Sequence, residues 1–200
     1  MSTVEPRKPR PGSTAIEIVT AITLTVGRCP AARAIADAAG VTDTDLVADV
    51  GCGPGTAVRE AARGGARAVG IDPSGATLWL ADRISVLRRA DRVSWTPGRA
   101  EALPLADDSV TIVWSLSSAH HWTNLTAALG EIRRVLVPGG KVLIAERLTR
   151  PGARGLAAHG FTSSQADSLA EQMTATGFAA VRIETLQAGR RNVIIVSGAG

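Results

Sequence analysis

The sequence predicts an α/β fold in which helices cover both faces of one mostly parallel, seven-stranded sheet. Short apolar runs alternate with segments of helical periodicity from residue 46 onward, and short loops join them. This alternation is typical of a parallel sheet with helices on both faces. The last two strand-like segments are separated only by a tight turn at Gly189, which makes them antiparallel. The last strand is therefore expected to be antiparallel in the sheet.

The elements are expected in a regular order along the chain. Short apolar runs predict strands at residues 46–50, 66–71, 92–96, 110–116, 141–146, 179–186 and 191–197. Apolar residues at helical spacing predict helices between them, at residues 56–63, 74–90, 123–136 and 163–176. Pro138, Gly139 and Gly140 are expected to end the third of these helices.

The region before the first strand is expected to form a lid. Residues 1–12 are rich in proline and charge, which predicts a disordered N-terminal lead. Residues 13–45 show helical spacing interrupted near residues 27–30, which predicts two lid helices, the second ending at Gly40. Two hundred residues fit one domain, so residues 13–200 are expected to fold together.

Composition and charge limit the classes of partner. The net charge is +4, but the arginines are scattered singly or in pairs, so a nucleic-acid partner is not expected. The only cysteines, Cys29 and Cys52, cannot build a disulfide framework, which favours a reduced, cytoplasmic setting. No stretch approaches the roughly 18 apolar residues of a membrane span. Nothing in the sequence indicates an oligomeric state.

A glycine-rich loop follows the first predicted strand. Glycines allow a tight turn and close approach of a ligand, and ligands of open α/β sheets bind beyond the carboxyl ends of the strands. A dinucleotide site would need a third glycine at Thr56, whereas Gly55 comes one residue early. Asp49 would repel a pyrophosphate but could face an ammonium group. The methionine end of S-adenosylmethionine (SAM) carries such a cation, so the loop favours SAM over NAD.

Asp72 ends the second predicted strand. A carboxylate there can accept both ribose hydroxyl protons of a nucleoside. An acid at a strand end can instead cap the next helix, so each acid alone is ambiguous. Asp49, the glycine loop and Asp72 together predict a nucleoside-containing ligand.

Five segments in order resemble the class I SAM-dependent methyltransferases of the ubiquinone/menaquinone type, which have a Rossmann-like fold. The matching segments are residues 47–55, 70–74, 100–105, 119–122 and 134–140. The resemblance implies methyl transfer from SAM, with S-adenosylhomocysteine as the product. It also implies that the glycine loop wraps the methionine part, that Asp72 binds ribose and that the backbone near Ala100 lies against adenine. The implied cofactor-binding residues are Asp49, Gly51, Cys52, Gly53, Asp72, Pro73, Arg99, Ala100, Glu101, Ser115 and Leu116.

Arg99 departs from the family pattern. Many relatives have an aspartate there that accepts a hydrogen bond from the adenine amino group, and arginine can only donate. Either backbone groups with Ile71 or Ala100 hold adenine, or Glu101 serves as the acceptor. Our hypothesis is the first alternative, with weaker SAM binding as its consequence.

His120 and His121 follow the fourth predicted strand, where a methyl acceptor would sit. Either could take a proton at neutral pH, so both are candidate catalytic residues. The pair also occurs in relatives with different chemistry, which leaves a structural or lid role open. Trp122 is expected in the core or pocket wall, and His159 is a lesser candidate. Glu146 is expected to line the pocket or to pair with an arginine, and we favour the pairing. The three histidines and two cysteines are dispersed in the sequence, so no metal site is expected.

The acceptor class is narrowed by motifs that the sequence lacks. The segment after the fourth strand reads Ser115-Leu116-Ser117-Ser118, without the Asn/Asp-Pro-Pro-aromatic signature of amino-methylating nucleic-acid enzymes, and no Pro-Cys pair for cytosine attack occurs. We therefore expect a small-molecule acceptor, methylated on oxygen. An RNA or protein methyltransferase and a non-catalytic SAM- or S-adenosylhomocysteine-binding module remain the alternatives.

Overall fold

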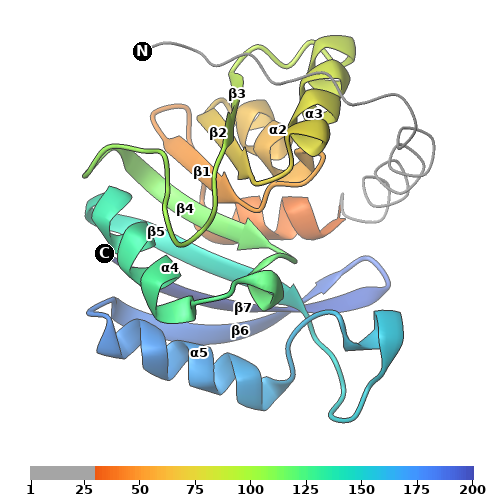
Figure 1. Cartoon of the computed structure of the whole chain (residues 1–200), viewed down its shortest axis with the longest axis vertical. Coiled ribbons are helices and arrows are strands. Elements are labelled where there is room, and N and C mark those ends of the chain that lie inside the picture. Colours follow the sequence, from red (N-terminus) through yellow and green to blue (C-terminus); the bar gives the residue numbers. More distant parts are fainter. Residues whose placement is uncertain (1–29) are drawn as a thin grey trace.

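The computed structural model describes residues 30–200, the side chains of residues 156 and 157 excepted, and contains a seven-stranded sheet (Figure 1). The strand order is β3-β2-β1-β4-β5-β7-β6. The first five strands pair in parallel, and β7 is antiparallel to both β5 and β6. This confirms the expected fold class. The strands are β1 (Leu46–Val50), β2 (Arg67–Asp72), β3 (Val93–Pro97), β4 (Val110–Leu116), β5 (Leu136–Arg147), β6 (Ala179–Ala188) and β7 (Arg191–Ala199).

The connections between strands are helical where the sequence predicts them. Ser74 accepts a hydrogen bond from the Thr77 backbone N–H and so caps α3. The helix over residues 30–39 ends before Gly40, as predicted, whereas the lead at residues 1–12 and the first lid helix lie outside the described residues. None of the helices within residues 30–200 is long and apolar enough to span a membrane. The connecting elements are α2 (Thr56–Arg63), α3 (Gly75–Leu87), η1 (Ala119–His121), α4 (Leu125–Val135), η2 (Gly155–Ala158) and α5 (Ser163–Ala175).

The turn from α4 into β5 differs from the prediction. α4 ends at Val135, and Leu136 is already the first residue of β5, well before the expected start at residue 141. Leu136 is buried and pairs with Val110, and the backbone N–H of Ser109 donates to the Val135 carbonyl. Sheet pairing therefore ends the helix, and residues 138–140 lie within β5 where its register against β4 shifts.

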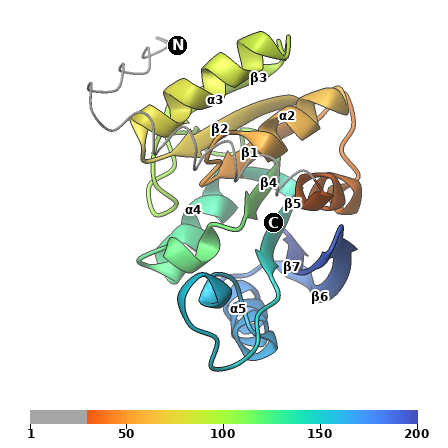
Figure 2. The ribbon, with the colours of Figure 1, turned by 90° about the vertical axis from the view of Figure 1, so that its right-hand side faces the viewer.

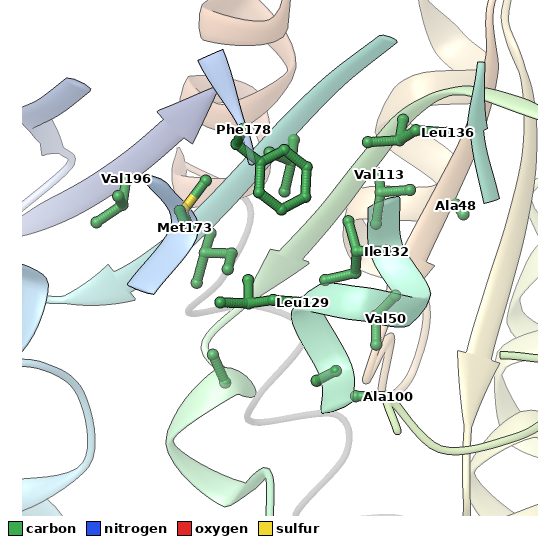
Figure 3. Close-up of a cluster of buried hydrophobic side chains, with 14 of the residues drawn as sticks. Ala48, Val50, Ala100, Val113, Leu129, Ile132, Leu136, Met173, Phe178 and Val196 are labelled. Atoms are coloured by element: carbon green, nitrogen blue, oxygen red, sulfur yellow. The ribbon is translucent and has the colours of Figure 1, made fainter. Parts of the chain in front are cut away.

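The sheet is packed on both faces. One apolar cluster joins it to α4 and α5 and includes Val113, Ile132 and Phe178 (Figure 3). A second cluster, which includes Ile112 and Trp114, joins the other face to α2, α3 and the helix over residues 30–39. Figure 2 shows α4 and the helix over residues 30–39 on opposite sides of β4 and β5. Because successive strand residues point to opposite faces, β4 contributes to both clusters and its carboxyl end is held from both sides.

Trp95 in β3 packs over two glycines at the base of the glycine-rich loop. A Cβ at Gly70 would lie 2.5 Å from Trp95 Cζ3 and 2.8 Å from Cys52 Sγ, and a Cβ at Gly55 would overlap the same indole. Gly55 also has a φ of 76°, which favours glycine. The indole ring therefore fills space that only glycines leave, and it holds the loop against β2 and β3.

Gly70→Ala is expected to destabilise the protein because the new methyl group overlaps the Trp95 ring. Such overpacking costs about 1–3 kcal/mol, to be measured by urea denaturation followed by circular dichroism. Gly75→Ala is the matched control, since nothing lies within 4 Å of a Cβ at that position. Equal stabilities of the two variants would contradict the close packing of Trp95, and the double variant Gly70→Ala/Trp95→Leu should recover part of the loss.

Candidate functional site

The glycine-rich loop lies at the carboxyl ends of β1 and β2. The backbone N–H groups of Gly51 and Cys52 donate to the carbonyl of Ile71, at 2.8 and 3.0 Å. Gly51 has a φ of 75°, and a Cβ there would overlap Ser118 Oγ in the segment after β4. The loop is therefore tied to β2 on one side and contacts the post-β4 segment on the other.

The Asp72 carboxylate connects the loop to the start of α3. Its Oδ2 accepts from the Gly53 N–H at 3.0 Å, and its Oδ1 accepts from the Ser74 N–H at 2.9 Å. The Asp72 carboxylate therefore lies beside the glycine-rich loop and next to the start of α3, a position compatible with both roles that the sequence leaves open. Pro73, between Asp72 and Ser74, is exposed.

Two carboxylates, those of Asp49 and Asp72, place negative charge beside the glycine-rich loop. Asp49 is 2% exposed at the end of β1. Burial, together with the negative charges of Asp49 and Asp72, raises the pKa of the Cys52 thiol well above its ordinary value. Cys52 therefore stays a neutral thiol. Of the two causes, only the carboxylates of Asp49 and Asp72 would also attract a cation, because burial disfavours a charge of either sign.

The segment after β3 separates into an exposed and a buried part. Arg99 is exposed and Ala100 is buried. The Glu101 carboxylate accepts from the Thr123 N–H at 2.7 Å, from the Thr123 hydroxyl at 2.9 Å and from the Asn124 N–H at 3.2 Å. Glu101 thus fixes the entry to α4, which Asn124 caps by accepting from the Ala127 N–H. All three hydrogen bonds end on Oε1, so they do not distinguish between the two hypotheses for the adenine acceptor.

The carboxyl end of β4 lies against the loop. Ser115 and Leu116 are both buried there. Ser115 Oγ and Thr56 Oγ1, the latter at the start of α2, are buried hydroxyls without a hydrogen-bond partner among the described residues. A buried polar atom of this kind is costly unless something bonds to it, so both atoms are suited to face a ligand.

The three histidines meet beyond the carboxyl ends of β4 and β5. The ring centroids of His120 and His121, both in η1, are 4.0 Å apart, and His159, just after η2, lies 5.4 and 5.8 Å from them. The expectation of dispersed histidines is therefore wrong, because the β5–α5 connection folds back over η1. Trp122 is partly buried and packs against the core, as expected.

Glu146 is paired with His120, which corrects the expectation of an arginine partner. His120 Nδ1 lies 3.0 Å from each carboxylate oxygen of Glu146, which is completely buried at the end of β5. The His120 backbone N–H also donates to Glu146 Oε1 at 3.3 Å. The sequence contains no signal for this pair, since 26 residues separate its members.

Comparison with known proteins identifies the family. A sequence profile for a methyltransferase domain matches residues 48–144. The 27-O-demethylrifamycin SV methyltransferase of Amycolatopsis mediterranei is 34% identical over 57% of this chain and 43% of its own length. The demethylmenaquinone methyltransferase of Tropheryma whipplei (strain Twist) is 32% identical over 57% of this chain and 46% of its own length. The matched part therefore spans less than half of each relative.

Residues 48–144, just under half of the chain, carry a methyltransferase domain of the SAM-dependent kind. The crystal structure of a SAM-dependent methyltransferase from Aquifex aeolicus superposes with a TM-score of 0.70 at 15% identity, over 84% of this chain and 88% of that one, which shows the shared fold. SAM is the cofactor of this family, and the residues present fit it. The site combines the glycine-rich loop at the carboxyl ends of the strands, the Asp72 carboxylate beside it and a buried hydroxyl at Ser115.

Glu101→Ala is expected to destabilise the protein at neutral pH, because the N–H groups of Thr123 and Asn124 lose their acceptor. The loss should be about 1 kcal/mol, measured by urea denaturation. Partial burial acts to raise the pKa of Glu101, but hydrogen bonds from its own backbone, Thr123 and Asn124 outweigh it and hold the pKa below its ordinary value of 4.5. The stabilisation is therefore present above pH 4.5 and lost as the pH falls through the folded-state value. A stability difference that stays constant across this acidic range would contradict the assignment.

Proposed function

We propose that this protein transfers a methyl group from SAM to a small-molecule acceptor, with oxygen as the methylated atom. The observation that carries the proposal is the glycine loop joined to Asp72 at the point where the strand order reverses. β1 pairs with β2 on one side and with β4 on the other. Open α/β sheets bind their ligands in the crevice at such a switch point.

The cofactor roles proposed for single residues follow the chain. The loop at Gly51, Cys52 and Gly53 wraps the methionine part, whose ammonium group lies near Asp49. Asp72, followed by Pro73, takes the ribose hydroxyls. The buried backbone at Ala100 lies against adenine, with exposed Arg99 beside it and the Glu101 carboxylate bound to Thr123 and Asn124. Ser115 and Leu116 support the cofactor from the end of β4.

The acceptor is proposed to enter beside η1. His120 and His121 supply ring nitrogens there, and we retain them as the catalytic residues that contact the acceptor. When bound, SAM supplies a methyl group on a sulfonium, which is already activated toward a nucleophile. What remains for the protein is to align the acceptor oxygen with that methyl group and to exclude water.

The names of the relatives favour a small-molecule acceptor. Their names refer to a rifamycin and to a demethylmenaquinone, both small molecules. These acceptors differ in chemistry, so oxygen as the target rests on our expectation from the sequence. If the protein were instead an RNA methyltransferase, it would bind RNA with an affinity that falls steeply as the salt concentration rises.

Calorimetric titration of the purified chain with SAM, S-adenosylhomocysteine and NAD tests the proposal. We expect the first two to bind and NAD not to bind. Asp72→Ala should weaken SAM binding roughly 10–100-fold, because hydrogen bonds to a charged carboxylate are lost. Asp91→Ala, at an exposed aspartate before β3, is the control and should bind as the unmodified chain does. Binding of NAD alone, or equal SAM binding by the Asp72 variant, would contradict the proposed site.

Arg99→Asp is expected to tighten SAM binding roughly tenfold, since it supplies the acceptor for the adenine amino group that arginine cannot provide. Arg99→Ala separates the gain of an acceptor from the loss of the arginine and should leave the dissociation constant close to its original value. Calorimetry on the three proteins measures the effect. An unchanged SAM affinity of the aspartate variant would show that the side chain at position 99 does not bind adenine.

A further inference from the structure

Every histidine of the chain lies in one cluster. The sequence contains three, and His120, His121 and His159 each offer a ring nitrogen within 4.8 Å of those of the other two. The first two come from η1, whereas His159 is brought in by the connection between β5 and α5. The fold therefore gathers three imidazoles, which are preferred donors for transition-metal ions, at the acceptor end of the sheet.

Glu146 fixes the tautomer of His120. His120 Nδ1 lies 3.0 Å from both oxygens of Glu146, a geometry that suits a hydrogen bond donated by Nδ1–H to the carboxylate. In a neutral imidazole the lone pair is then on Nε2. A carboxylate behind the ring of a histidine is the arrangement that orients metal-binding histidines and strengthens them as donors.

His120 Nε2 has no partner that would occupy its lone pair. The atom is buried and makes no hydrogen bond to any of the described residues. Leaving a buried acceptor unsatisfied costs free energy, and a bound cation would remove that cost.

We propose that His120, His121 and His159 bind a divalent transition-metal ion of the zinc class, with Glu146 as the positioning residue behind His120. Three nitrogens about 2.0–2.1 Å from a tetrahedral ion lie roughly 3.4 Å from one another. The present separations extend to 4.8 Å, so the rings must approach one another on binding. His121 and His159 are exposed, and rotation of their side chains can supply this movement.

The chemistry of the site rests on the proposed function. Three protein ligands leave an open position, as in catalytic zinc sites, and the acceptor hydroxyl would occupy it. Coordination lowers the pKa of a bound hydroxyl, so its proton passes to solvent and the oxygen stays on the ion as an alkoxide. That oxygen forms the bond to the methyl carbon while the carbon–sulfur bond breaks, with its electron pair remaining on sulfur. The histidines then act as ligands and not as proton acceptors.

Titration of the untagged, chelator-treated chain with Co²⁺ tests the site by visible absorbance, and calorimetry with Zn²⁺ gives the stoichiometry. We expect one ion per chain and intense absorbance bands typical of low-coordinate Co²⁺. His159→Ala and His121→Ala should each weaken binding more than about tenfold, and Glu146→Gln should weaken it about 10–100-fold. Failure of the unmodified chain to bind either ion, or unchanged binding by the His159 variant, would overturn the proposal.

SAM affinity measured on the same preparations separates this inference from the proposed function. His159→Ala leaves the glycine loop and Asp72 intact, so it should bind SAM as the unmodified chain does, which also shows that it is folded. Metal binding without SAM binding would refute the function and keep the metal site. SAM binding without metal binding would refute the metal site and keep the function.

Discussion

The position of β1 between β2 and β4 decides where every part of the site lies. The chain builds outward from β1 in one direction through β2 and β3, and then crosses to β4 on its other side. The loops that follow β1 and β4 consequently meet at one edge of the sheet. Gly51 and Ser118 are in contact there, at a distance that leaves no room for a Cβ on Gly51. The glycine-rich loop and the segment after β4 are neighbours because of this reversal in strand order.

Three carboxylates hold the loops that this arrangement brings together. The Asp72 carboxylate accepts hydrogen bonds from N–H groups of the glycine loop and of the start of α3. The Glu101 carboxylate accepts hydrogen bonds from N–H groups at the entry to α4. The Glu146 carboxylate accepts a hydrogen bond from the His120 backbone N–H and also contacts Nδ1 of the His120 ring. Each acid therefore positions a segment that is remote from it in sequence. The same groups set the charge of the site, which is negative near Cys52 and beside His120.

Most of the fold could be predicted from local sequence patterns. The boundaries of β1, α2 and β4 agree with the sequence prediction, because each begins and ends where apolar periodicity meets glycine or polar residues. The start of β5 is predicted at residue 141 but lies at Leu136, because Leu136 pairs with Val110 of β4, a strand distant in sequence. Likewise, no local sequence pattern predicts that the Trp95 ring packs over Gly55 and Gly70.

The sequence by itself determined the alternation of strands and helices, the antiparallel last strand and the glycine-rich loop between Asp49 and Asp72. These depend on periodicity, on turn residues and on spacing within one strand–loop–helix unit, all of which are local. Only the tertiary structure decided that Glu146 faces His120, that Glu101 binds the residues before α4, and that the three histidines lie in one cluster. Such contacts join segments on different strands, and their distances are set by how the sheet orders and registers those strands, which local pattern does not encode.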